Sequence, residues 1–446
     1  MNPGGIRAYL DKHAEPDAAT ALALEGAWSH AVCIPACAED ASFFDTLQSL
    51  QETKGGSETV VVLVVNAAVD SSPAIHRTNE AFLALLRERC DLSAAPIALG
   101  HWKDLAVMLV DRASPERRLP AREGVGLARK IAADIALALI NRGSIASPWI
   151  LCTDADVQLP TDYLSALPPP DAPLAAALFP FAHVPEGESG LQQAMVLYET
   201  YLHYYVLGLA SAGSPYAYHT IGSLLALHAP HYAAVRGFPK RQAGEDFYLL
   251  HKLVKVAPVL PMRSGRIRIR GRRSDRVPFG TGAALQKIQG GQVCGETYTV
   301  YDPRVFTGLG AWLSALATFA ENPEAAPIAR VLEETNPLGS LLVDALTSLG
   351  ALEAAEKARH HTRPGAALYR RLVEWNDGFR TLRLVHTLRD QGLSSLPLDQ
   401  ALREASFVPP HAGDTPADLL ARLRERVESA AGVPRGPSTP PRIKRT

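Results

Sequence analysis

Apolar and polar residues alternate in short blocks over roughly the first two thirds of the chain. Short apolar runs bounded by turn residues predict strands that are buried on both faces, at 31–34, 59–65, 106–110 and 149–152. Apolar residues with helical spacing predict helices at 18–24, 42–51, 74–89 and 126–142. Because strands and helices alternate, the pattern indicates an α/β fold with a mostly parallel sheet flanked by helices.

The pattern changes near Tyr301, after which helical spacing dominates. Helices are predicted at 310–320, 326–334, 341–349 and 368–391. The last residues are rich in Pro, Arg and Ser, a composition typical of disorder. We therefore expect a lead-in at 1–29, an α/β domain at 30–300, a helical C-terminal domain at 301–431 and a disordered tail at 432–446.

Composition places the chain among soluble globular proteins. Hydrophobic residues make up 47% and charged residues 20% of the 446 positions, and the net charge is −1. This balance offers no bulk attraction to nucleic acid or membranes. Five irregularly spaced cysteines fit neither a disulfide framework nor a zinc site, so we expect a reducing, cytoplasmic location. The most apolar stretch, 191–212, is interrupted by Glu199 and His203, and no membrane span is expected.

Two acidic residues, Asp154 and Asp156, directly follow the predicted strand 149–152. The chain turns beyond a strand end, so both carboxylates can converge. Ligands of open α/β sheets bind at this edge, and paired carboxylates suit a hard divalent cation such as Mg²⁺ or Mn²⁺. Taken alone, such a pair is more often a solvated acidic turn than a metal site.

Further segments with polar residues occur in order along the same region. They are 34–39 with Glu39, 64–71 with Asn66 and Asp70, the G-x-x-x-A-R sequence ending at Arg129, and the Gly244-Glu245-Asp246 triplet after Gly237-Phe238-Pro239. Each has an ordinary structural alternative. Glu39 could cap a helix, Asn66 and Asp70 could be turn residues, Arg129 could be exposed, and the acidic pair could begin a helix.

The ordered set of motifs resembles the family 2 glycosyltransferases of the GT-A fold, over about residues 31–282. The resemblance implies a GT-A sheet, to which the helical C-terminal domain predicted from periodicity is appended outside the region of resemblance. It also implies a non-processive enzyme, because a Q-x-x-R-W motif is missing. It implies that the donor site includes Ala36, Glu39, Asn66, Asp70, Arg129 and Asp154, and that Asp156 with Asp154 binds the metal. It implies Asp246 as the catalytic base, with Glu245 as second choice. One departure is that neither an aromatic residue nor Asn follows Pro35.

The function that the resemblance implies is metal-dependent transfer of a sugar from a nucleotide-sugar donor, a UDP- or GDP-sugar, to an acceptor hydroxyl. A cation would neutralise charge on the leaving diphosphate, and a carboxylate would deprotonate the acceptor. We expect inversion by single displacement, although retention stays open. The alternatives are a silent nucleotide-sugar binding or scaffold protein, and a sugar nucleotidyltransferase, whose Gly-rich basic loop is absent from 35–40. The helical domain could bind acceptor or form a homo-oligomer.

Arginines are concentrated after the second acidic motif, at 263, 266, 268, 270, 272 and 273. Their alternation with Ile predicts a strand with one charged face, which is either solvated or a cationic wall for a diphosphate. The segment 274–282 predicts a loop that closes over the site, with Arg276 assigned to the donor. Tyrosines at 198, 201, 204 and 205 are interpreted as packing residues, with sugar stacking as the alternative. His219 and the small turn 220–223 are further candidates on the acceptor side.

Overall fold

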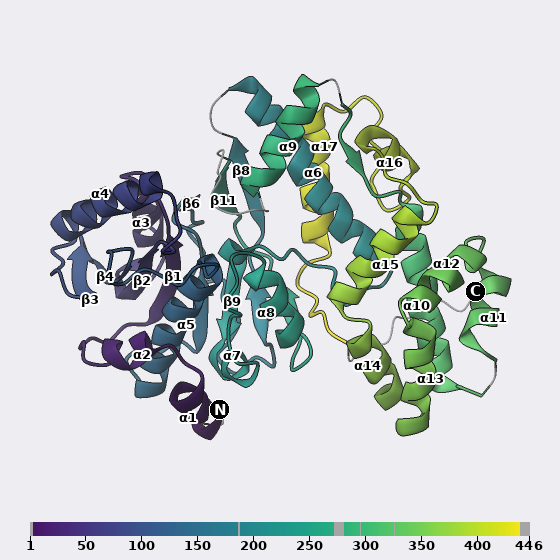
Figure 1. Ribbon diagram of the computed structural model, residues 1–446, viewed down its shortest axis with the longest axis horizontal. Coiled ribbons are helices and arrows are strands. Elements are labelled where there is room, and N and C mark those ends of the chain that lie inside the picture. The colour runs from purple at the N-terminus through teal and green to yellow at the C-terminus, as the bar shows by residue number, and fades with distance from the viewer. Residues whose placement is uncertain (1–2, 186–187, 272–280, 295, 325, 438–446) are drawn as a thin grey trace. The chain divides into compact units, whose positions relative to one another are not determined.

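The computed structural model describes residues 3–185, 188–271, 281–294, 296–324 and 326–437. The chain divides into two compact units. The first comprises Met1–Gln192, Thr220–Ala284 and Ala431–Pro434, and the second comprises Gln193–His219, Leu285–Ala430 and Arg435–Thr446. Figure 1 labels the elements of both units.

The first unit is built on an eight-stranded sheet with the order β10-β7-β9-β5-β1-β2-β4-β3. Its central strands β5, β1, β2 and β4 are parallel neighbours, whereas β3 and β9 are antiparallel to the strands beside them. The strands are β1 (His30–Ala36), β2 (Thr59–Asn66), β3 (Ile97–Trp102), β4 (Leu105–Arg112), β5 (Trp149–Cys152), β7 (Ala176–Leu178), β9 (Leu225–His228) and β10 (Val259–Pro261). The predicted α/β class with a mostly parallel sheet is confirmed.

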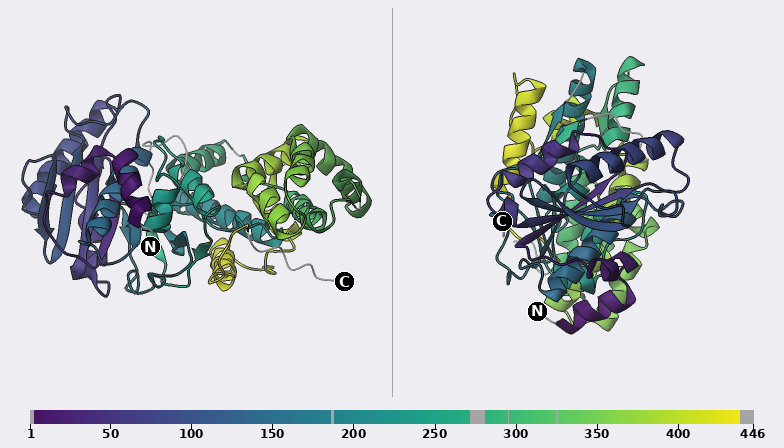
Figure 2. Two further views of the ribbon diagram at one scale, coloured as in Figure 1. Left: turned by 90° about the horizontal axis from the view of Figure 1, so that it is seen from below. Right: turned by 90° about the vertical axis from the view of Figure 1, so that its left-hand side faces the viewer.

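Helices lie on both faces of this sheet (Figure 2). Every residue of β2 is buried, as expected for a β-branched strand covered on two sides. The helix α5 (Val125–Arg142) is buried along most of its length because it packs between the sheet and the N-terminal helices. The other helices are α1 (Pro3–Lys12), α2 (Pro16–Ala21), α3 (Phe43–Gln51), α4 (Pro73–Arg89), α7 (Ala229–Ala234) and α8 (Glu245–Leu253), with the 3₁₀ turns η1 (Gly56–Glu58) and η2 (Gly222–Leu224).

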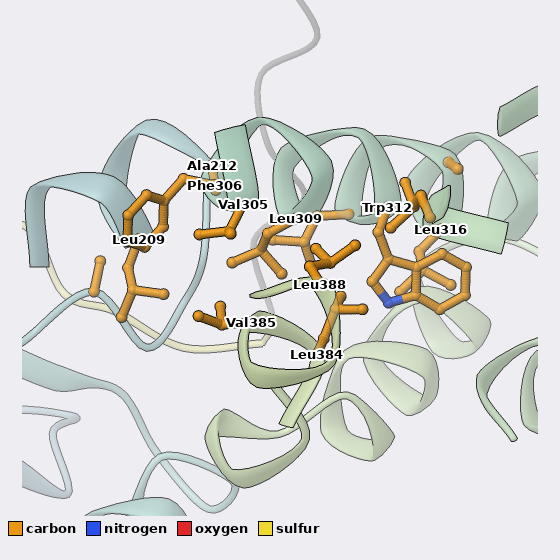
Figure 3. Close-up of a cluster of buried hydrophobic side chains, with 14 of the residues drawn as sticks. Leu209, Ala212, Val305, Phe306, Leu309, Trp312, Leu316, Leu384, Val385 and Leu388 are labelled. Atoms are coloured by element: carbon orange, nitrogen blue, oxygen red, sulfur yellow. The ribbon is translucent and has the colours of Figure 1, made fainter. Parts of the chain in front are cut away.

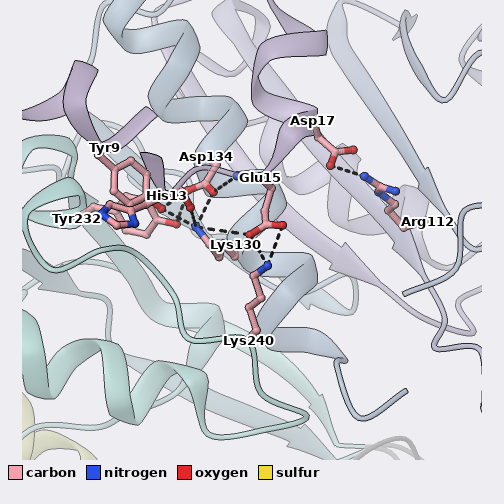
Figure 4. A network of polar contacts seen from close by, with 9 residues as sticks. All are labelled: Tyr9, His13, Glu15, Asp17, Arg112, Lys130, Asp134, Tyr232 and Lys240. Carbon is pink, nitrogen blue, oxygen red and sulfur yellow. Dashed lines mark hydrogen bonds and ion pairs between the residues drawn. The ribbon is translucent and has the colours of Figure 1, made fainter. Parts of the chain in front are cut away.

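A buried polar network holds the N-terminal helices against α5 (Figure 4). Asp134 accepts hydrogen bonds from the hydroxyls of Tyr9 at 2.7 Å and Tyr232 at 2.9 Å, and its other oxygen pairs with Lys130 at 2.7 Å. Burial raises the pKa of Asp134, while Lys130 opposes this shift. Because each buried charge has partners, the network fixes α1 without leaving an unpaired ion.

A smaller sheet with the order β6-β11-β8 follows the two acidic residues along the chain. It contains β6 (Val157–Gln158), β8 (Phe181–Pro185) and β11 (Ile267–Gly271). In β11 the side chains of Ile267 and Ile269 are buried, while Arg268 is exposed and Arg270 is half-buried. The predicted strand with one charged face is therefore confirmed.

The second unit is helical, as predicted for the C-terminal region. Its core surrounds Phe306, Leu309 and Trp312 of α10, which pack with Leu209 of α6 and Leu388 of α15 (Figure 3). Its elements are most of α6 (Ser189–Ser211) and α9 (Thr281–Val293), β12 (Thr299–Val300), α10 (Arg304–Glu321), α11 (Ile328–Thr335), α12 (Gly339–Ser348), α13 (Ala351–His361), α14 (Ala366–Trp375), α15 (Gly378–Asp390), β13 (Leu396–Pro397), α16 (Leu398–Glu404) and α17 (Pro416–Ser429).

One predicted helix differs from the structure, and several strands and helices of the structure were not predicted. The single helix expected at 368–391 is two helices, because Asp377 caps α15 by accepting a hydrogen bond from the Arg380 amide at 3.1 Å. The strand β3 was not predicted, since Gly100 and His101 interrupt its apolar pattern; it forms a hairpin with β4. None of the helices in the described ranges combines the length and apolar character that crossing a membrane requires.

Candidate active site

Arg129 of α5 connects the two acidic motifs that the sequence singled out. Its Nη2 donates to Asp154 Oδ1 at 2.5 Å and its Nε donates to Glu245 Oε1 at 2.8 Å. Its Nη1 donates to the carbonyl of Gly222 at 3.0 Å. The arginine is only 4% exposed, so its guanidinium is held by these protein acceptors. A direct contact between Arg129 and a donor remains a prediction.

The two carboxylates beside Arg129 stabilise its positive charge. Burial alone would lower the pKa of Arg129, but the carboxylates of Asp154 and Glu245 outweigh it and raise the pKa further above its ordinary value. The pairs also differ in exposure, because the Glu245 side chain is 4% exposed and that of Asp154 is 33% exposed. Arg129 and Glu245 therefore form a buried pair, whereas Asp154 also reaches the surface.

The turn that carries Asp154 and Asp156 is fixed through its backbone. The hydroxyl of Thr46 in α3 lies 2.9 Å from the carbonyl of Ala155 and 2.8 Å from that of Val157, and it accepts a hydrogen bond from the Val157 amide at 3.2 Å. The Arg270 amide of β11 donates to the Asp156 carbonyl at 3.1 Å. No sequence pattern singles out Thr46, which is 109 positions from Ala155.

The second acidic motif begins α8. Gly244 precedes the helix in a left-handed conformation, with a φ of 74°, which a residue with a Cβ rarely adopts. Glu245 and Asp246 then occupy the first turn, where the helix dipole favours negative charge. The Phe247 amide donates to Asp246 Oδ1 at 2.7 Å. Glu245 and Asp246 therefore begin a helix, as the structural alternative expected. Their catalytic role stays a prediction, and a position at the start of a helix is compatible with it.

The surroundings of Asp246 change the acidity of its carboxyl group. Burial, together with the charge of Glu245, raises the pKa of Asp246 to about 7, although Arg129 acts in the opposite direction. Its side chain is half-buried. A carboxyl with a pKa near 7 can exchange a proton at neutral pH, which is the property required of a general base.

Glycines let the elements of this site approach closely. A Cβ on Gly126 would lie 2.6 Å from the Arg241 carbonyl oxygen, and the Gly126 amide donates to that oxygen at 3.0 Å. A Cβ on Gly222 would lie 2.5 Å from Nη2 of Arg129. The start of α5 therefore packs directly against the segment before α8 and the turn at 220–223.

The loop after β1 is held by two buried asparagines. Asn66 donates through Nδ2 to the Ala36 carbonyl at 3.0 Å, and Asn79 donates to the Asn66 carbonyl at 2.9 Å. Asn79 also accepts from the amide of Ala38, whose φ is 53°. Asn66 thus has a structural role that the sequence did not suggest, and Asn79, which is fully buried, was missed because α4 shows no motif there.

The other predicted donor residues occupy different environments. Ala36 is 1% exposed and Glu39 is 5% exposed, whereas Asp70 lies exposed in the turn before α4. Arg276 and most of the predicted closing loop lie outside the described residues, as do Arg272 and Arg273. The contacts of these residues with a donor stay predictions.

The tyrosines and His219 belong to the second unit. Tyr204 is fully buried in its core and donates to the Tyr301 carbonyl at 2.7 Å, which is a packing role. The ring of His219 packs edge-on against that of His203, with ring centroids 4.9 Å apart. Of the candidates predicted for an acceptor side, the turn 220–223 is joined to Arg129 through the Gly222 carbonyl.

The two carboxylates after β5 could bind a cation whose remaining ligands are phosphate oxygens and water. Within the described ranges, no cluster of three or more His, Cys, Asp or Glu side chains could hold a metal by itself. Mg²⁺ and similar ions need only one or two carboxylates when phosphate oxygens and water complete the shell. Asp154 and Asp156 are both partly exposed, and Arg129 occupies one oxygen of Asp154.

No protein-family model and no curated protein matches the sequence. Among solved structures, the chain is similar to the mannosyltransferase PcManGT from Pyrobaculum calidifontis in complex with GDP-Man and Mn²⁺, with 16% identity and a TM-score of 0.35 over 87% of this chain and 94% of that chain. It is also similar to residues 1–349 of S. aureus TarS in complex with UDP-GlcNAc, with 12% identity and a TM-score of 0.36 over 82% and 92% of the two chains. Likeness at this level does not identify an activity.

Proposed function

We propose that this protein is a glycosyltransferase that moves a sugar from a nucleotide-sugar donor to an acceptor hydroxyl, with inversion by single displacement. The observation that carries the proposal is the joining of Asp154 and Glu245 by one buried guanidinium, that of Arg129. It brings the motif expected at the donor diphosphate together with the motif expected at the acceptor.

Asp246 supplies the general base in this proposal. Its pKa of about 7 means that a substantial fraction is ionised at neutral pH and can accept the proton of an attacking hydroxyl. Glu245 is tied to Arg129 by its Oε1 atom, so it is the less available of the two acids. Burial and the charges of Glu245 and Arg129 then set the pKa of Asp246.

Asp156, with Asp154, would hold a Mn²⁺ or Mg²⁺ ion together with the donor diphosphate. Such an ion supplies positive charge where the leaving diphosphate becomes negative. Thr46 and the Arg270 amide keep the backbone of this turn in place for that purpose. Arg129 would orient Asp154 beside the diphosphate through their ion pair.

The loop after β1 supports sugar transfer over nucleotidyl transfer. A triphosphate site uses free backbone amides of a glycine-rich loop. Here Ala38 donates its amide to Asn79 at 2.8 Å, and segment 35–40 contains neither Gly nor Lys. This loop is suited to bordering a nucleoside, with Ala36 and Glu39 as the proposed contacts.

Incubating the protein with Mn²⁺ and a panel of UDP- and GDP-sugars, followed by mass spectrometry, tests the proposal. We expect release of a nucleoside diphosphate with transfer or slow hydrolysis, and loss of turnover in Asp246→Asn with donor binding retained. Asp156→Ala should instead weaken metal-dependent donor binding. Binding without turnover in the wild type would favour the silent binding protein, and absence of both would reject the donor site. An NMR assignment of the product anomer decides between inversion and retention.

A further inference from the structure

The second unit contains a cavity of about 930 Å³ that the proposed reaction does not use. Its lining residues come from α6, from the segment 296–298, from α16 and the loop that follows it, and from the start of α17. These three helices are labelled in Figure 1. All these residues belong to the second unit, whereas Arg129 and the acids it joins belong to the first. Its volume is within the range of about 300–1,000 Å³ that is usual for small-molecule sites.

The walls of the cavity are mainly apolar. Val196 and Leu197 line it from α6, Leu398 and Leu402 from α16, and Leu419 from α17. Loop prolines and Tyr298 add further apolar surface. A ligand of this cavity would gain free energy chiefly by burying an apolar body.

The polar groups that line the cavity mostly accept hydrogen bonds. The charged side chains of the lining are three acids, Glu296, Asp399 and Asp414, and one base, Arg403. Arg403 is paired with Asp399 at 2.9 Å, and Asp414 is paired at 3.2 Å with Arg422, which does not line the cavity. Three acids against one arginine give the lining a net negative charge, which the pairing of Asp414 with Arg422 reduces but does not cancel.

His411 adds another acceptor. Its Nδ1 lies 3.1 Å from the carbonyl of Pro409. Because a carbonyl oxygen only accepts, Nδ1 carries a proton, and in the singly protonated form of the ring Nε2 is therefore an acceptor. A ligand that donates hydrogen bonds is complementary to this lining, whereas an anionic group is not.

We propose that this cavity binds an amphiphile with an apolar body and a hydrogen-bond-donating, uncharged or cationic head. The apolar body lies against the leucines of α16 and α17, and the head lies near Asp399 and Glu296. An anionic amphiphile is disfavoured because the acids outnumber the basic group. The inference is independent of sugar transfer, since none of the lining residues has a role in that reaction.

Calorimetric titration of the full chain with 1,2-decanediol, decylammonium and decanoate, each below its micelle concentration, tests the proposal. We expect one saturable site for the diol and the ammonium, and at least about tenfold weaker binding of decanoate. Shortening the diol to six carbons should weaken binding by about threefold or more per methylene. Equal binding of decanoate, no dependence on chain length, or no saturable binding of the diol would each overturn the proposal.

A charge reversal on the rim separates a specific site from general hydrophobic binding. Asp399 is 67% exposed, so Asp399→Lys should fold normally, which circular dichroism checks. It should improve decanoate binding about fivefold and weaken decylammonium binding. The matched control is Glu353→Lys, at an exposed position of α13 that does not line the cavity. The same response in both variants would contradict a site at this cavity.

Discussion

Arg129 and Glu245, 116 positions apart in the sequence, form a buried ion pair with Nε and Oε1 separated by 2.8 Å. The same guanidinium pairs with Asp154 at 2.5 Å. One residue of α5 therefore sets the positions of two acidic motifs that lie at the end of β5 and the start of α8. This relationship makes Arg129 the first target for mutation.

Arg129→Met should destabilise the protein by about 3 kcal/mol or more, because it leaves Glu245 as a buried, unpaired charge. Urea denaturation measures the change in the free energy of unfolding. The control is Arg330→Met, which removes an exposed pair with Glu334 and should change stability by less than about 0.5 kcal/mol. Equal effects of the two substitutions would show that the buried pair is not important for stability.

The pH dependence of sugar transfer should follow the ionisation of Asp246. Activity is expected to rise through an apparent pKa near 7, since only the ionised carboxylate can act as a base. Arg129 lowers the pKa of Asp246, so a folded Arg129→Lys variant with a displaced charge should shift the rising limb to higher pH. Steady-state rates between pH 5 and 9 measure this limb. A flat profile over that range would argue against Asp246 as the base.

Asp246 should also make the folded protein less stable as the pH rises. An unfolded carboxyl of this type loses its proton near pH 4, about its ordinary pKa, whereas the folded state keeps the proton up to a pKa of about 7. The contribution of the protonated form is complete below pH 4 and is lost between pH 4 and 7. Asp246→Asn should therefore raise the melting temperature, relative to the wild type, more at pH 8 than at pH 5.

Thermal melts of both proteins at the two pH values measure that difference. Glu353→Gln, at an exposed position, provides the control for removing a negative charge. A constant offset between Asp246→Asn and the wild type across pH would mean that Asp246 titrates at an ordinary value when folded.

Thr46→Val should destabilise the protein by about 1–3 kcal/mol, because it leaves the buried Ala155 and Val157 carbonyls and the Val157 amide without this hydroxyl. Looser anchoring of the acidic turn should also weaken metal-dependent donor binding. Thr318→Val is the matched control, since that hydroxyl lies at an exposed position of α10. If both variants retained wild-type stability and donor binding, Thr46 would have no anchoring role.

The acidic motifs could be predicted because their chemistry is local in sequence. Two carboxylates directly after an apolar strand indicate the edge of a sheet whatever the rest of the chain does. The partners of these motifs could not be predicted in the same way. Asn79 and Thr46 lie in amphipathic helices whose spacing explains them as ordinary helical residues, and the contacts that give them roles come from distant segments.

One missed feature did have a local signal. The predicted helix 368–391 is broken at Asn376-Asp377-Gly378, a sequence typical of a turn followed by a helix cap. Helical periodicity on both sides obscured it. Periodicity reports which face is buried, whereas a cap reports where a helix begins, and the two are independent.

The sequence by itself determined the central parallel strands β1, β2, β4 and β5, the helices α2 to α5, the helical character of the C-terminal region and the residues proposed for the chemistry. Those features follow from the spacing of apolar residues along the chain and from the ionisable side chains in it. Only the tertiary structure decided that Arg129 is buried between Asp154 and Glu245, that Asn66 holds a loop, and that a cavity forms beside α16. Burial and long-range pairing set charge, pKa and cavity shape, and these depend on segments brought together only by folding.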